Sequence, residues 1–139
     1  MKVRDVMTPH PITVSPETSV PEAMQLMQTH GFRRLPVVEG GELVGIVTDR
    51  DLKEALPSSA TTLSIWEMNH LLSRLQVAEV MSEQVITVKA QTELVQAAEL
   101  MLTHKIGGLP VVSSLGHVIG IITVTEVLRA FVEQQHAAD

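Results

Sequence analysis

Thr48, Asp49, Arg50 and Asp51 bring a hydroxyl, two carboxylates and a guanidinium to the end of the apolar run 45–47. A threonine followed three residues later by an aspartate is typical of a helix N-terminus, where hydroxyl and carboxylate each accept one backbone hydrogen bond. The same groups suit a nucleotide, because a hydroxyl and free N–H groups bind phosphate and a carboxylate binds the two hydroxyls of a ribose. The pattern alone therefore leaves a helix cap and a ligand site both open.

Three arginines lie near this motif. Arg33 and Arg34 precede the apolar run 35–38, and Arg50 lies inside the motif itself. The chain has a formal net charge of -6 and a pI near 5.4, so an anionic ligand must be held by local positive charge. A helix cap does not need such cations, although solvated loop residues would explain each arginine taken alone.

Composition narrows the class of protein. The acidic charge argues against wrapping nucleic acid or coating an anionic membrane, since both need a basic surface. Two phenylalanines and one tryptophan are too few for a base-stacking platform. No apolar run has the length of a signal peptide or a membrane span. We therefore expect a soluble globular protein in the cytoplasm, with no nucleic acid and no membrane as partner.

Motifs for catalysis and metal binding are missing from the sequence. It has no cysteine, which excludes disulfides and thiolate zinc sites. Its six histidines show no zinc-binding spacing. A nucleophile elbow, a P-loop and a dinucleotide fingerprint are likewise absent. We expect neither an enzyme nor a resident metal, because nothing in the sequence positions a metal or an attacking water.

The chain repeats itself. VRDVMT from residue 3 aligns with VAEVMS from residue 77, and LMQTHGFRRLPVV aligns with LMLTHKIGGLPVV at the same offset of 74. One residue inserted in the following turn shifts LVGIVT onto VIGIIT at an offset of 75. Such internal repetition determines the architecture before any motif does. We divide the chain into repeat 1 (1–57), a linker with a short helix (58–76) and repeat 2 (77–139).

Each repeat is expected to fold as β-α-β-β-α. In repeat 1 a β-rich run at 12–14 is followed by apolar residues at helical spacing over 20–31. A hairpin with two glycines is expected at 35–47, and a short helix at 49–56. The last helix of repeat 2 should run from Val124 toward Glu133 with Val127, Leu128 and Phe131 facing inward. In the linker, Ser64 should cap a helix that continues to about Leu72.

A repeat of this size is marginal alone. We therefore expect the two copies to share a core, as an α+β fold in which the repeats pack as a pseudo-two-fold pair through three-stranded sheets. Equivalent clefts would lie where the halves meet. The exposed faces of the paired helices would remain for a second chain.

The doubled pattern V-x-x-V-M-[TS], I-T-V, L-P-V-V and G-I-[VI]-T-x-x-[DE] resembles tandem cystathionine-β-synthase-type domains, called CBS pairs or Bateman modules. It covers the chain from Val3 to about Val132, and the combination in duplicate is specific. The chain is also similar to stand-alone bacterial CBS proteins of the acetoin-utilisation type, including the helix with Trp66 between the copies.

This resemblance implies a regulatory ligand that contains adenosine, such as AMP, ADP, ATP or S-adenosylmethionine, in place of any catalytic cofactor. It places Thr48 and Asp51 on ribose and phosphate, and it assigns a phosphate-directed cation to the position of Arg33; Arg34 and Arg50 join the set as neighbouring cations. It implies that small apolar residues sandwich the adenine, at Ile12, Thr13, Leu35, Pro36 and Val37.

The second cleft differs from the first. Gly107 and Gly108 replace the paired arginines, and Glu126 replaces the aspartate of the family pattern. A longer carboxylate misses the diol or pushes the ribose outward, so we expect this cleft to be weak or empty. Its candidate residues are Ile86, Thr87, Leu109, Pro110, Thr123 and Glu126.

Two functions remain open at this point. The first is a homodimeric regulatory module that senses an adenosine-containing ligand and signals in trans to another protein. The second is a ligand-free dimerisation or interaction module in which Thr48 and Asp51 only cap a helix. The arginines discriminate between the two, because a cap does not require them.

Overall fold

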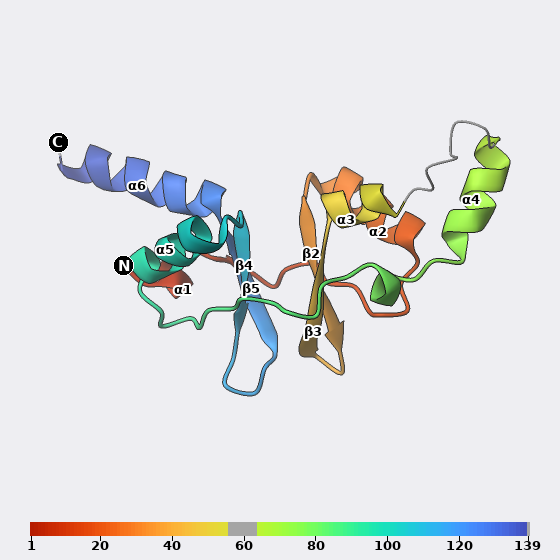
Figure 1. Cartoon of the computed structure of the whole chain (residues 1–139). Helices are drawn as coiled ribbons and strands as arrows, with labels where there is room; N and C mark the ends of the chain where they lie inside the picture. The colour runs from red at the N-terminus through yellow and green to blue at the C-terminus, as the bar shows by residue number, and fades with distance from the viewer. Residues whose placement is uncertain (56–63, 139) are drawn as a thin grey trace. The chain divides into compact units, whose positions relative to one another are not determined.

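The structure, a computed structural model, describes residues 1–55 and 64–138. They form two compact units that we describe separately. The middle unit is Ile12–Val85, and the terminal unit combines Met1–Pro11 with Ile86–Asp139. Most element labels of both units are shown in Figure 1. The compact units differ from the sequence repeats at two places, because residues 1–11 belong with the second repeat and residues 77–85 belong with the first.

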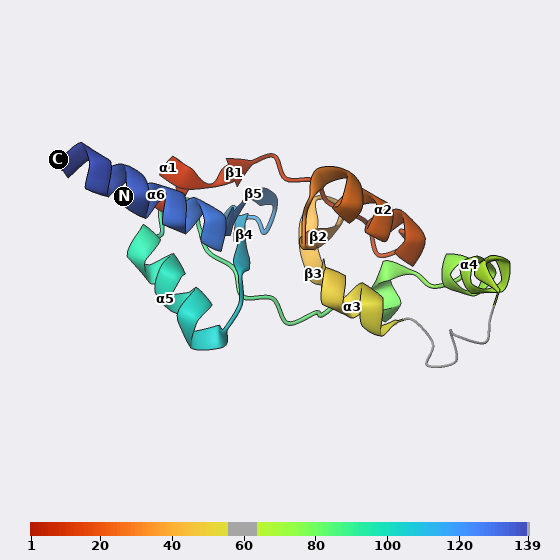
Figure 2. The ribbon, with the colours of Figure 1, turned by 90° about the horizontal axis from the view of Figure 1, so that it is seen from above.

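The middle unit is built on one hairpin. Strands β2 (Arg34–Glu39) and β3 (Glu42–Thr48) are antiparallel, and Gly40 and Gly41 make the turn with positive φ angles of 60° and 85°. Helix α2 (Val20–His30) precedes the hairpin, and α3 (Asp49–Glu54) follows it. Figure 2 shows these helices beside the hairpin. The unit also contains α4 (Ile65–Ser73) and the 3-10 turn Val77–Glu79.

Local signals explain where these helices begin and end. The Ser19 hydroxyl accepts from the Glu22 N–H at the start of α2, and Gly31 ends it in the left-handed conformation with φ 69°. The Ser64 hydroxyl accepts from the Glu67 N–H, 3.1 Å away, at the start of α4. These starts and ends agree with the sequence expectation. The start of the linker, 58–63, lies outside the described residues, as does the expected end of α3 at Leu56 and Pro57.

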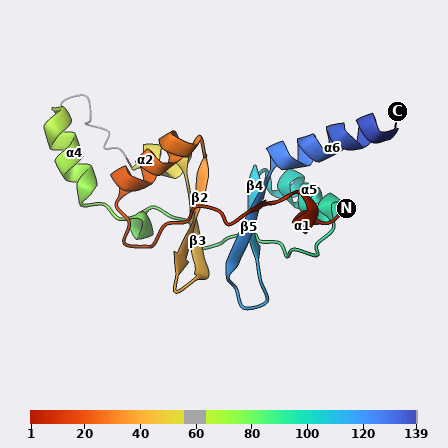
Figure 3. The same cartoon turned by 180° about the vertical axis from the view of Figure 1, so that it is seen from behind.

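The terminal unit repeats this plan. Its elements are α1 (Val3–Val6), β1 (Thr8–Pro9), α5 (Leu94–His104), β4 (Gly108–Val112), β5 (Val118–Thr123) and α6 (Val124–Ala138). The strand order is β1-β5-β4, with both pairs antiparallel. Figure 3 shows α6 beside α1 and α5. The mixture of short sheets and helices confirms the expected α+β class.

A short segment of each repeat completes the unit of the other. The N-terminal arm (Met1–Pro11) pairs Thr8 with Ile121 of β5. The inner arm (Val77–Ser82) pairs Ser82 with Ile46 of β3. These arms are the two copies of V-x-x-V-M-[TS], so equivalent segments occupy equivalent places.

Among the described residues, the buried hydrophobic side chains form two clusters. One contains Val14, Val20, Ala23, Met27, Leu35, Val37, Val47, Leu52 and Val77, and the other contains Val3, Val88, Ala97, Met101, Leu109, Val111 and Ile122. The single shared core that we expected is therefore replaced by one cluster in each unit. Each cluster nevertheless includes one valine from the opposite sequence repeat, Val77 in the first cluster and Val3 in the second.

Two further expectations need correction. The β-rich runs 12–14 and 86–88 form only isolated parallel bridges, Val14 with Val37 and Val88 with Val111, so they are not full strands. In α6, Val127 packs against the core, but the side chains of Leu128 and Phe131 are 57% and 58% exposed. Helix α6 is longer than expected, and most of its residues are exposed.

Candidate ligand-binding site

Thr48 and Asp51 form a complete capping box at the start of α3. The Thr48 hydroxyl accepts from the Asp51 N–H at 3.1 Å, and Asp51 Oδ2 accepts from the Thr48 N–H at 2.9 Å. Both side chains are partly buried. Because the Thr48 hydroxyl acts as an acceptor in this box, its own hydrogen remains available for a ligand.

The hairpin register places a cation beside this box. Arg34 is the direct antiparallel partner of Thr48, so both side chains are on the same face of the hairpin. Burial lowers the pKa of the Arg34 guanidinium from its ordinary value, the Asp49 charge raises it, and the Arg33 charge lowers it. An arginine remains charged despite such a shift. The hairpin therefore holds a partly desolvated positive charge across from the capping threonine.

The other two arginines are in different surroundings. Arg33 is exposed in the turn before β2, where its carbonyl accepts from the Asp49 N–H at 2.8 Å. Arg50 Nε pairs with Glu54 Oε1 at 3.0 Å, and 85% of its side chain is exposed. An exposed i,i+4 pair of this kind contributes little to stability. Of the three candidate arginines, Arg34 is the one directly paired with the capping box.

The residues expected to contact the adenine lie in residues 12–13 and in strand β2. The parallel bridge of Val14 with Val37 aligns Ile12 and Thr13 with the start of β2, and both are partly buried. Leu35, Pro36 and Val37 are completely buried, and Leu35 and Val37 belong to the core cluster. Other residues of the chain therefore cover these three side chains. Ile12 and Thr13 are the more accessible of the residues expected to contact the adenine.

The equivalent place in the terminal unit is organised differently. Glu126 Oε2 accepts from the Thr123 N–H at 3.2 Å and also from the Thr123 hydroxyl. Glu126 Oε1 accepts from the Thr8 hydroxyl of the N-terminal arm at 2.9 Å. The positions equivalent to Arg33 and Arg34 are Gly107 and Gly108. Ile86 and Thr87 are partly buried, and Leu109 and Pro110 are buried.

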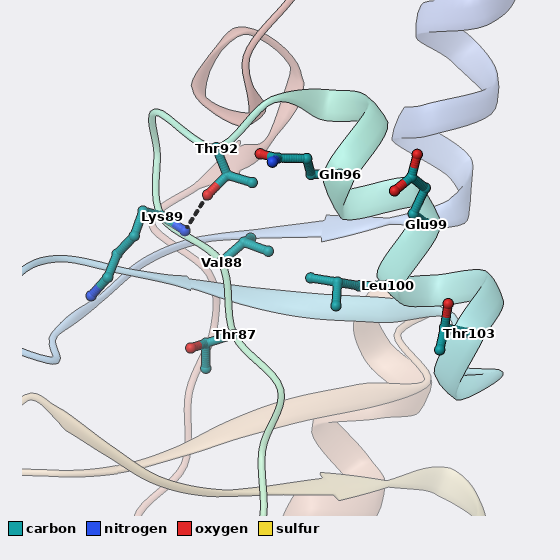
Figure 4. A pocket seen from close by; sticks show the side chains of 8 residues that line it. All are labelled: Thr87, Val88, Lys89, Thr92, Gln96, Glu99, Leu100 and Thr103. Atoms are coloured by element: carbon teal, nitrogen blue, oxygen red, sulfur yellow. Dashed lines mark hydrogen bonds between the residues drawn. The ribbon is translucent and has the colours of Figure 1, made fainter.

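A pocket of about 470 Å³ lies in the terminal unit between residues 87–92 and α5. Figure 4 shows its lining residues, which are Thr87, Val88, Lys89, Thr92, Gln96, Glu99, Leu100 and Thr103. The Lys89 amine points away from the pocket and donates to the Ser113 carbonyl at 3.0 Å. Only Thr87 of this lining was a sequence candidate. The others are polar helix and turn residues together with the apolar Val88 and Leu100, so their types and spacing do not indicate a site.

Two searches of the described residues add limits. In residues 1–55 and 64–138, no group of three or more His, Asp or Glu side chains is arranged to hold a metal ion. Across the same residues, none of the helices combines the length and apolar character needed to cross a membrane.

The duplicated hairpins, each followed by a T-x-x-[DE] element and completed by an exchanged arm, can now be compared with known proteins. The CBS domain family matches residues 3–58 and 77–133. This chain belongs to the CBS-domain family, as a tandem pair. The V-x-x-V-M-[TS], L-P-V-V and T-x-x-[DE] motifs are thus parts of two CBS domains, as the resemblance implied.

Solved structures of CBS pairs resemble the whole fold. AcuB from Vibrio cholerae, a protein named for acetoin utilization, has a TM-score of 0.83 and 34% identity, with 98% of this chain and 93% of that chain covered. The CBS domain pair of MJ0100, in complex with 5'-methylthioadenosine and S-adenosyl-L-methionine, has a TM-score of 0.81 and 29% identity. The match covers 96% of this chain and 98% of that chain. CBSX2 from Arabidopsis thaliana, in complex with AMP, has a TM-score of 0.80 and 34% identity. This match also covers 96% of this chain and 98% of that chain.

Several curated relatives are much longer than this chain. Protein MJ1225 of Methanocaldococcus jannaschii is 36% identical over 136 residues, which are 93% of this chain and 46% of that protein. An inosine-5'-monophosphate dehydrogenase of Korarchaeum cryptofilum is 41% identical over 125 residues, which are 90% of this chain and 22% of the enzyme. The chain thus spans less than half the length of these relatives.

Proposed function

We propose that this CBS pair is a regulatory module that binds an adenosine-containing ligand at the Thr48–Asp51 box of its middle unit. The pairing of Arg34 with Thr48 carries the proposal. A helix cap is complete with the threonine and the aspartate alone, so a partly buried cation beside it has no capping role. Two of the similar structures hold adenosine compounds, AMP in CBSX2 and S-adenosyl-L-methionine with 5'-methylthioadenosine in the MJ0100 pair.

Each group has a distinct role in this proposal. The Thr48 hydroxyl donates its free hydrogen to a ligand phosphate, and the Arg34 guanidinium supplies the charge that an acidic chain otherwise lacks. Asp51 accepts from the ribose diol. Ile12 and Thr13 contact the adenine, with Leu35, Pro36 and Val37 packed behind them. Arg33 and Arg50 are exposed cations that attract the anionic ligand before it binds.

Regulation follows from differential affinity. A ligand that binds one arrangement of the protein more tightly than another shifts the population toward that arrangement. We propose that a partner protein reads this shift in trans, and that the module itself catalyses no reaction. We further propose a homodimer, formed through the exposed apolar side chains of α5 and α6, which include Leu102, Leu128 and Phe131.

A second candidate is a ligand-free interaction module. The observation that favours it is the completeness of the Thr48–Asp51 box without any ligand. In that case the box would stabilise α3 by about 1 kcal/mol and do nothing else. The two candidates make different predictions for Arg34, since a change there should affect ligand binding but not the cap.

Thermal unfolding tests the proposal. AMP, ATP, S-adenosylmethionine and GTP are each added in large excess to the wild-type chain, to Asp51→Ala and to Arg34→Met. A ligand at about 100 times its Kd stabilises by about 2.7 kcal/mol, which should raise Tm by several degrees. We expect a rise with adenosine compounds only, lost in Asp51→Ala and reduced in Arg34→Met, which keeps the box.

The opposite result is equally informative. If no compound raises Tm of the wild type while Asp51→Ala lowers Tm without ligand, the box is only a helix cap. The ligand-free interaction module then replaces the sensor.

A further inference from the structure

The carboxylate of Glu126 in the second repeat is bound by a hydroxyl from the N-terminal arm. Thr8 Oγ1 donates to Glu126 Oε1 at 2.9 Å. The arm is held in place by the pairing of Thr8 with Ile121 and of Pro9 with Gly120. The Lys2 amine adds an ion pair with Glu93 Oε1 at 2.9 Å. The hydroxyl is therefore part of an ordered arm and faces this carboxylate.

The first repeat lacks this contact. Ser82 is equivalent to Thr8 and pairs in the same way with β3, through Ile46. Its hydroxyl donates to the Gln84 carbonyl at 3.3 Å. The Asp51 side chain is one methylene shorter than that of Glu126 and is engaged in the capping box with Thr48. Two substitutions, Thr for Ser in the arm and Glu for Asp on the helix, thus distinguish the two places.

Counting acceptors shows what this difference does. A carboxylate has about four lone-pair positions. Glu126 uses three of them, on the Thr8 hydroxyl, the Thr123 hydroxyl and the Thr123 N–H. A ribose diol needs two, so one position is too few. Within residues 1–55 and 64–138, Asp51 uses one, on the Thr48 N–H, which leaves room for both hydroxyls.

The capping threonines also have opposite polarity. Thr48 accepts a hydrogen bond from Asp51 N–H and keeps its own hydrogen. The Thr123 hydroxyl donates its hydrogen to Glu126 Oε2, so this hydrogen is not available to a ligand. The second repeat therefore has neither a free diol acceptor nor a free threonine donor.

We propose that Thr8 is a specificity-determining residue that closes the second repeat to ribose by occupying Glu126. This inference rests on the proposed function, because it assumes that the matching carboxylate of the first repeat, Asp51, accepts a ribose diol. Thr8 supplies from within the chain a hydroxyl that stands where a ribose hydroxyl would bind. The asymmetry of the CBS pair is thus set partly by a residue of the first sequence repeat.

Isothermal titration with adenosine tests this inference. Adenosine carries no phosphate, so the missing arginines of the second repeat do not affect the comparison. The variant Thr8→Ser/Glu126→Asp gives the terminal unit the residues that the middle unit has at the equivalent places, Ser82 and Asp51. We expect one adenosine per wild-type chain and two per variant chain. In an Asp51→Ala background the same pair of changes should raise the stoichiometry from zero to one, and 2'-deoxyadenosine should not bind at the new site.

A reciprocal variant keeps the test decisive if the first variant folds poorly. Ser82→Thr/Asp51→Glu gives the middle unit the residues that the terminal unit has at the equivalent places, and we expect adenosine affinity to fall at least about tenfold. Thermal unfolding without ligand reports whether each variant is folded.

The outcomes separate the two proposals. One adenosine per wild-type chain, with two per graft or a weakened reciprocal variant, supports the role of Thr8. One adenosine per chain in every variant, with unchanged affinity, overturns the role of Thr8 and leaves the first site intact. Two per wild-type chain also overturns it, because the second repeat would then be open. No binding to the wild type overturns the proposed function and this inference with it.

Discussion

The α-carbon of Gly45 faces the sulfur of Met81 so closely that a Cβ at residue 45 would lie 2.6 Å from Sδ and 2.9 Å from the Ser82 carbonyl. Gly120 has the same relationship with Met7, at 2.5 Å from Sδ, and with the Thr8 carbonyl at 3.1 Å. Each arm therefore lies on a glycine of the opposite repeat, and the absence of a side chain there allows the arm to dock.

Gly45→Ala should consequently destabilise the middle unit. Methionine is flexible, but the backbone carbonyl of Ser82 is not, so the arm must shift. Overpacking of this kind costs about 1–3 kcal/mol, and we expect Tm in thermal unfolding to fall by several degrees. Gly120→Ala should do the same in the terminal unit. Adding Met81→Ala to Gly45→Ala relieves the sulfur contact alone and should not restore wild-type stability. An unchanged Tm in both single variants would show that the arms do not need these glycines.

Much of each unit is readable from local sequence. The spacing of Val20, Ala23 and Met27 predicts the buried face of α2, and Gly31 predicts its end. Gly40 and Gly41 predict the hairpin turn. These signals succeed because the residues that determine each element lie within it.

The exchange of arms between the repeats cannot be predicted from local sequence in the same way. Val3 and Val77 carry the same local pattern, and either could enter either core cluster. Which cluster each enters depends on contacts between residues far apart in the chain, such as Val3 with Thr92 and Val77 with Thr18. The exposure of Leu128 and Phe131 was mispredicted for a related reason, since helical spacing marks an apolar face without saying what covers it.

The candidate site shows the same division. Thr48 and Asp51 are recognisable from their spacing, and the structure adds their hydrogen bonds. The family resemblance favours Arg33 over Arg34 and Arg50, and only the hairpin register distinguishes Arg34. Thr8 could not be identified at all, because 118 residues separate it from Glu126.

The ends of α2 and α5 offer a second prediction. Both end in the left-handed conformation, with Gly31 at φ 69° and Lys105 at φ 55°. A side chain in this conformation costs roughly 1–2 kcal/mol, which glycine avoids, although glycine also makes the unfolded chain more flexible. We expect Lys105→Gly to stabilise the protein by up to about 1 kcal/mol in chemical denaturation.

Gly31→Lys is the matched control for this change. Nothing lies within 4 Å of a Cβ built at Gly31, so the substitution tests the backbone conformation without a steric clash. It should destabilise by a similar amount. Equal stability of both variants and the wild type would mean that the left-handed cap carries no cost here.

The ion pair of the N-terminal arm predicts a pH dependence. The hydrogen bond from Lys2, and its charge, lower the pKa of Glu93 below its ordinary value. Because the folded-state pKa is depressed, the pair stabilises the docked arm above the ordinary carboxyl pKa. The contribution is lost as pH falls through the lower folded-state value. NMR titration of Glu93 should show the depressed pKa in the wild type and a higher one in Lys2→Met. An identical pKa in both proteins would contradict the assignment to Lys2.

The exposed face of α6 leads to a prediction for the proposed homodimer. Phe131 and Leu128 are more than half exposed on α6, while Leu102 of α5 is 79% exposed. If a second copy covers these side chains, a carboxylate at residue 131 would be buried without a partner, at a large cost. We expect chromatography with light scattering to give a dimer for the wild type and a monomer for Phe131→Glu at the same concentration. Leu115→Glu is the matched control, because Leu115 is 73% exposed beyond β4 and outside this face. A dimer that survives Phe131→Glu, or is lost equally in Leu115→Glu, would place the contact between copies elsewhere, since only a buried site should discriminate between these two equally drastic changes.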